Sequence, residues 1–127
     1  MTITSKNFIF LKKHFPELAI LADFAEQYIY SDPSSALVKL RSFVEQTVLI
    51  IYKELGLSNP EGQTLIDLMK NNEFSESISQ DVLNKLHGIR INGNKAAHSA
   101  NIDSDMALWW LREAHDISRW LYISLFG

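Results

Sequence analysis

The sequence predicts an all-α fold, a single-domain bundle of four main helices with one or two short helices. Apolar residues recur at helical spacing through four long segments, and capping or turn residues separate those segments. No segment shows the strict alternation of a β-strand in a way that competes with a helix. With 127 residues, 46% hydrophobic and 21% charged, the chain suits one helical domain over 1–127.

Prolines and a glycine mark the ends of the first helices. A short helix is expected over Asn7–Phe15, and a second helix over 16–29 begins at a proline. The third has the strongest pattern, a long apolar stripe over 33–55 with Asp32 as N-cap and a proline in its first turn. Gly56 is its expected C-cap, because glycine adopts the left-handed conformation that commonly ends a helix.

The second half of the chain predicts one short helix and two long ones. A short amphipathic helix is expected over 64–70, followed by an irregular polar segment over 71–77. Ser79 is the expected cap of a long helix that continues to residue 98, and 99–103 should break it. The last helix is expected over 104–125, with a broad apolar band.

Composition excludes several functional classes. The chain has no cysteine, so it has neither disulfides nor a thiolate metal site, which fits a cytoplasmic location. The net charge of -3 does not suit a protein that coats nucleic acid, so any such contact should be local. Neither a signal peptide nor a membrane span is expected. The four histidines are isolated, and no glycine-rich phosphate loop is present, so we expect no metal or cofactor site in this domain.

The most informative segment is 85–103, which places glycine and asparagine inside a predicted helix although glycine costs about 1 kcal/mol there. Arg90, Asn94 and His98 follow one another at i, i+4 spacing and share one helix face. One interpretation is a structural polar seam in which these residues bond to a partner helix, where Arg41 and Glu45 are the expected partners.

The other interpretation is catalytic. Arg90 and His98 are candidate catalytic residues for RNA cleavage, in which histidine moves a proton and arginine stabilises the charged phosphate. On an ideal helix, however, the two residues are separated by about 12 Å of rise. They would meet at one phosphate only through the reach of arginine, a broken helix or a dimer interface.

Tryptophans concentrate on the last helix. Trp109, Trp110 and Trp120 recur at a spacing that usually serves a core or an interface rather than a base-stacking platform. Trp109 and Trp110 are adjacent and point about 100° apart, so the helix needs packing on two sides. The sequence therefore predicts that another domain or chain covers part of this surface.

Four segments, in this order, resemble a known family: NFIFLKKHFPEL, SDPSSALVKLRSFVEQ, IRINGNKAAH and ALWWLREAHDISRWLYISLFG. Together they are similar to the helical domain at the N-terminus of type I restriction enzyme R subunits, especially of the type IA kind. The resemblance covers nearly the whole chain. Its most specific parts are Leu40–Glu45 and Ile89–His98.

The resemblance implies a role inside a larger protein. In such R subunits this domain precedes an endonuclease domain and a helicase motor, and the complex translocates DNA with ATP and cleaves it with Mg²⁺. The chain would then be a non-catalytic module of a type I site-specific deoxyribonuclease. Its expected partners are the later domains of that subunit, the methyltransferase and specificity subunits and, through the complex, DNA.

The domain also resembles distant members of the HEPN superfamily, some of which are metal-independent ribonucleases acting as dimers. Their motif places histidine closer to arginine than the seven residues that separate Arg90 from His98 here, which favours the structural seam. A HEPN-like ribonuclease homodimer and a free-standing adaptor of a defence system remain the alternatives. The residues themselves leave open whether the chain is an enzyme.

Overall fold

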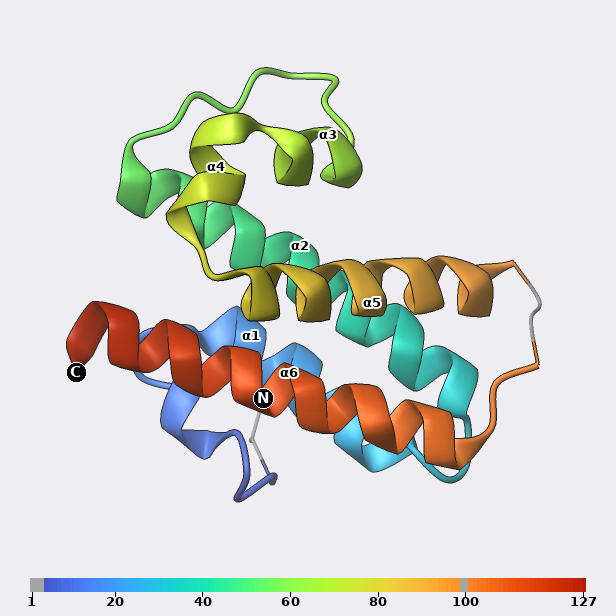
Figure 1. Cartoon of the computed structure of the whole chain (residues 1–127). Coiled ribbons are helices and arrows are strands. Elements are labelled where there is room, and N and C mark those ends of the chain that lie inside the picture. The colour runs from blue at the N-terminus through green and yellow to red at the C-terminus, as the bar shows by residue number, and fades with distance from the viewer. Residues whose placement is uncertain (1–3, 99–100) are drawn as a thin grey trace.

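The structure, a computed structural model, describes residues 4–98 and 101–127 and confirms the predicted all-α class. Across these ranges the chain forms one 3-10 turn and six α-helices, and no strand (Figure 1). The elements are η1 (Ile9–Leu11), α1 (Pro16–Tyr28), α2 (Pro33–Leu55), α3 (Leu65–Lys70), α4 (Asn72–Ser77), α5 (Gln80–Ala97) and α6 (Ser104–Phe126). No described helix combines the length and the apolar character that crossing a membrane requires.

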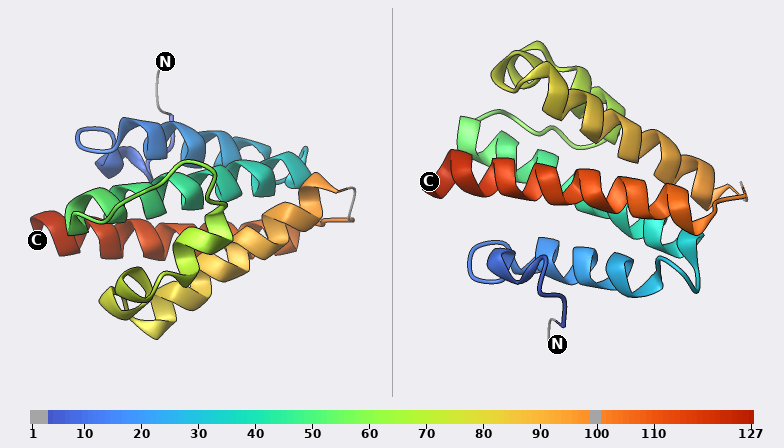
Figure 2. Two further views of the ribbon diagram at one scale, coloured as in Figure 1. Left: turned by 90° about the horizontal axis from the view of Figure 1, so that it is seen from above. Right: turned by 60° about the horizontal axis from the view of Figure 1, so that its bottom comes forward.

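Helix α2 is the centre of the bundle and packs against α1, α5 and α6. Helices α1 and α5 lie on opposite sides of the layer that α2 and α6 form (Figure 2). The core also includes buried residues of α6, such as Leu111, Ile117 and Leu121. The largest fully buried side chains come from residues 8–29, from α2 and from the segments α3 to α5: Tyr52, Phe8, Phe43, Phe74, Leu11, Leu18, Ile29, Leu37, Leu40, Met69, Leu86 and Ile89.

The ends of the long helices follow the predicted capping residues. The Asp32 side chain accepts a hydrogen bond from the Ser35 backbone N–H at 3.2 Å, and Gly56 ends α2 in the left-handed conformation with a φ of 67°. Ser79 caps α5 in the same manner through the Val82 N–H. The predicted break over 99–103 lies partly outside the described residues, and 101–103 form no helix.

Two short segments differ from their predictions. The segment 71–77, expected to be irregular, contains α4, because the Asn71 side chain accepts from the Phe74 N–H at 3.0 Å and the Phe74 ring is fully buried against Tyr52. The helix expected over Asn7–Phe15 is reduced to η1. The turn before η1 is organised by the Ser5 hydroxyl, which accepts hydrogen bonds from the backbone N–H groups of Asn7 and Phe8. These bonds compete with those of a helix.

Candidate functional site

Part of the predicted seam lies where α5 crosses α2. The crossing is close because Gly93 has no side chain: a Cβ there would lie 2.5 Å from the Arg41 Cβ and 3.1 Å from the Leu37 carbonyl oxygen. Arg41 Nε donates to Asn94 Oδ1 at 2.6 Å, and Arg41 Nη1 lies 3.6 Å from Glu45 Oε2. The structure thus brings Arg41, Glu45 and Asn94 together in one half-buried group.

Arg90 and His98 lie outside this group. Arg90 is half-buried, its Nε has no hydrogen-bond partner, and none of the carboxylates in the described ranges lies within ion-pair distance of it. His98 is the exposed C-cap of α5, and its backbone N–H donates to the Lys95 carbonyl. The structure therefore does not show the carboxylate partners expected for these two residues.

Arg90 of α5 and Lys70 of α3 both act on His87. Burial lowers the pKa of His87, and the positive charges of Arg90 and Lys70 lower it further. His87 is thus held in its neutral form more strongly than an ordinary exposed histidine.

The three tryptophans of α6 have different environments. Trp110 is half-buried and packs so closely on α5 that a Cβ on Gly88 would lie 2.2 Å from its Cη2. Trp120 is also half-buried and packs against the core. Trp109 remains 57% exposed. Of the three residues predicted to form an interface, Trp109 has the largest free surface.

A lysine joins α5 to α6. Lys85 Nζ lies 3.2 Å from Asp81 Oδ2, 3.4 Å from Glu113 Oε2 and 3.2 Å from Asp116 Oδ2. Burial alone would lower the pKa of Lys85, but the three carboxylates outweigh it and raise the pKa above its ordinary value. Within the ranges 4–98 and 101–127, we find no group of three or more histidine or carboxylate side chains arranged to hold a metal ion.

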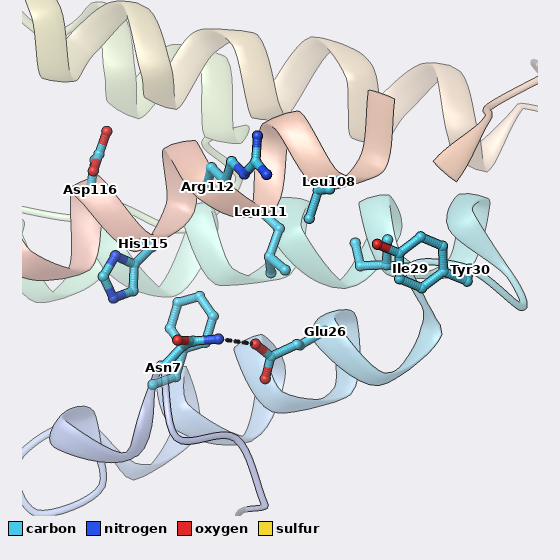
Figure 3. A pocket seen from close by; sticks show the side chains of 10 residues that line it. Asn7, Glu26, Ile29, Tyr30, Leu108, Leu111, Arg112, His115 and Asp116 are labelled. Atoms are coloured by element: carbon cyan, nitrogen blue, oxygen red, sulfur yellow. Dashed lines mark hydrogen bonds between the residues drawn. The ribbon is translucent and has the colours of Figure 1, made fainter. Parts of the chain in front are cut away.

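A cavity lies between α1 and α6, at the turn that leads into η1 (Figure 3). It has a volume of about 660 Å³, which is within the usual range for small-molecule sites. Its deep residues are apolar, with Phe8, Ile29 and Leu111 buried. Two polar side chains lie on opposite sides of it: Glu26 on α1 and His115 on α6.

A buried carboxylate positions the turn that forms one wall of this cavity. Asp23 is only 4% exposed, and its Oδ1 accepts from the Ser5 backbone N–H at 2.8 Å. The Ser5 hydroxyl in turn accepts from the N–H groups of Asn7 and Phe8 at 3.2 Å and 3.3 Å. Asn7 Nδ2 then donates to Glu26 Oε1 at 2.5 Å. This chain of bonds fixes Asn7 and Phe8 against α1.

Sequence reasoning did not identify this cavity. Its residues come from 7–30 and 108–116, and none of them forms a recognisable motif. The one local signal was Asp23, a carboxylate at a position that helical spacing assigns to the buried face between Ala19, Ala22 and Ala25. A buried carboxylate needs partners, so this position is the signal that would have indicated a polar contact there, and the sequence analysis did not use it.

Comparisons with known proteins agree with the resemblance to type I restriction enzyme R subunits. A family model described as "Domain of unknown function (DUF4145)" matches residues 23–124. Among curated proteins, the chain is similar to the type I restriction enzyme EcoKI endonuclease subunit of Escherichia coli (strain K12), with 30% identity over 122 residues. The match covers 94% of this chain and 10% of that subunit, so the chain spans about a tenth of its relative's length. No solved structure matches the chain significantly. The chain therefore belongs to the family described as Domain of unknown function (DUF4145).

Proposed function

We propose that this chain serves as a non-catalytic helical module of the R subunit of a type I restriction-modification enzyme. The observation that carries the proposal is the similarity to an endonuclease subunit over 94% of the chain, although the chain corresponds to only 10% of that subunit. Nuclease and motor activities would then belong to other parts of the parent protein. ATP and Mg²⁺ would act there as well.

The role of the module would be docking. Trp109 and Met106 lie one turn apart on α6 and are 57% and 38% exposed, although large apolar side chains of this kind are enriched in protein interfaces. In the parent subunit this face would pack on a later domain or on the methyltransferase core. Contact with DNA would be local or made through the complex, because the module carries a net charge of -3.

The test uses a full-length R subunit that contains this module. Deletion of the module should weaken assembly with the methyltransferase and lower restriction of unmodified DNA. Trp109→Ala should have the same effect in weaker form, about 1–2 kcal/mol of assembly free energy, because buried tryptophans often dominate interfaces. Leu55→Ala, an exposed apolar residue at the end of α2, is the matched control. Unchanged assembly and restriction after deletion would refute the proposal.

The rival function is HEPN-like cleavage of RNA without metal by a dimer. One observation favours it: Arg90 forms no ion pair with any carboxylate in the described ranges, so its charge is free to act on a phosphate. RNA cleavage that disappears in both Arg90→Ala and His98→Ala, while the fold is retained, would support this rival over the docking module. A free-standing adaptor of a defence system would retain its function without any R subunit.

A further inference from the structure

We propose that the cavity between α1 and α6 binds a small arylalkylamine, whose ammonium group pairs with Glu26 and whose ring covers the apolar floor. The inference goes beyond the docking role, since neither Trp109 nor Met106 lines this cavity. The volume of about 660 Å³ accommodates a ligand with one aromatic ring. Two features carry the proposal: a carboxylate that has no cation as partner, and an apolar floor beside it.

The carboxylate belongs to Glu26, which is half-buried on α1. In the described ranges no lysine, arginine or histidine lies within ion-pair distance of it. Asn7 Nδ2 donates to Glu26 Oε1 at 2.5 Å, which orients the carboxylate and leaves Oε2 to a ligand (Figure 3). A group that is already oriented loses less conformational freedom when a ligand binds. An ammonium group would donate to Oε2 in a charge-assisted hydrogen bond.

The basic side chains that line the cavity do not compete for Glu26. Arg112 lies on the rim, but its guanidinium points away from α1 (Figure 3). His115 lies on the opposite wall, where its ring packs edge-on against Phe8 at 5.4 Å between ring centroids. Asp23, one turn before Glu26, is a second carboxylate, and it accepts from backbone and side-chain donors that carry no charge. The α1 side therefore favours a ligand cation over an anion.

The apolar part of the cavity accounts for the ring of the ligand. Phe8, Ile29 and Leu111 form the floor and are buried. Accessible apolar surface comes from Leu108, which is half-buried, and from Tyr30, which is 76% exposed at the edge. A ring placed over these side chains displaces water from them, which favours binding. The site therefore suits an amine with an apolar body better than a bare ammonium ion.

The experiment titrates the 127-residue chain with phenethylamine and with phenethyl alcohol, followed by heteronuclear NMR. The two probes share the ring and the linker, and only the amine carries a charge. We expect the amine to bind with a Kd below about 1 mM and about tenfold more tightly than the alcohol. The largest shift changes should occur at the backbone N–H groups of Phe8, Ile29 and Leu111. Equal affinity for the two probes, or shift changes centred elsewhere, would overturn the proposal.

Two matched variants test the carboxylate. Glu26→Gln keeps the size of the side chain and removes its charge, so it should remove the preference for the amine and leave binding of the alcohol unchanged. Glu17→Gln removes the same charge from the exposed start of α1 and should retain the tenfold preference. Circular dichroism checks that both variants keep the fold. A preference that survives Glu26→Gln, or that disappears in both variants, would overturn the role of Glu26.

A last titration tests whether the ligand is a free amine. A lysine side chain of another protein would offer the same ammonium group on a thinner stem, and the methylamide of Nα-acetyl-lysine is the probe for it. We expect this probe to bind several-fold more weakly than phenethylamine, because its stem covers less of the apolar floor. Equal or tighter binding of the lysine probe would overturn the assignment to an arylalkylamine.

Discussion

Replacing Gly93 with alanine should destabilise the bundle although alanine is the better helix former. The new Cβ would lie 2.5 Å from the Arg41 Cβ and 3.1 Å from the Leu37 carbonyl oxygen. Both atoms belong to α2 or are attached directly to its backbone, so neither can rotate away. The two helices must therefore move apart, which also lengthens the bond from Arg41 Nε to Asn94 Oδ1, now 2.6 Å.

The magnitude follows from two opposing terms. Overpacking at a close contact costs about 2–3 kcal/mol, and the helix propensity of alanine over glycine returns about 1 kcal/mol. The expected net loss is about 1–2 kcal/mol of unfolding free energy. In a chain of this size, that corresponds to a fall of roughly 4–8 °C in Tm.

Thermal and urea unfolding, followed by circular dichroism, measure this loss. Asn84→Ala is the matched control, because it lies on the exposed face of the same helix and tests propensity without a helix contact. It should leave Tm unchanged or raise it slightly. If Gly93→Ala raised Tm as well, the close crossing of α2 and α5 would be refuted.

Three further predictions concern the core and the polar groups. A double-mutant cycle on Arg41→Ala and Asn94→Ala should give a coupling of about 1–2 kcal/mol in urea unfolding, and a value near zero would show that their bond does not hold α2 to α5. Phe74→Ala should lower the free energy of unfolding by about 3–5 kcal/mol because the ring is fully buried. A loss of less than about 1 kcal/mol, which is typical of an exposed residue, would contradict the packing of α4. The pKa of His87 is lower in the folded state than its ordinary value of 6.5, so protonation favours unfolding and stability should fall as the pH drops below about 6.5. His87→Gln should make this loss smaller in unfolding curves at several pH values. An unchanged pH profile would contradict the lowering of the His87 pKa by burial and by the charges of Arg90 and Lys70.

Sequence reasoning succeeded where structure is decided locally. The boundaries of α2 depend on Asp32, Pro33 and Gly56, each of which acts on its own turn of helix. The long apolar stripes predicted the bundle because a helix with one apolar face must bury it against another element. These features need no knowledge of which helices meet.

Features that depend on tertiary contacts were harder to predict. Helix α4 has a polar sequence, and its only large apolar side chain, Phe74, becomes fully buried because Tyr52 of α2 packs against it. Lys85 meets Glu113 and Asp116 only because α5 and α6 lie side by side. The cavity between α1 and α6 likewise requires the two ends of the chain to come together.

The unusual composition of α5 has a structural explanation in its two glycines. Gly93 gives α2 room to approach, and Gly88 gives the ring of Trp110 room on α6, so each glycine serves a different neighbour of the same helix. Asn94 then binds Arg41 across the first contact. Packing thus accounts for Gly88, Gly93 and Asn94 without any chemistry. The segment that first suggested catalysis therefore serves to position three helices, α2, α5 and α6.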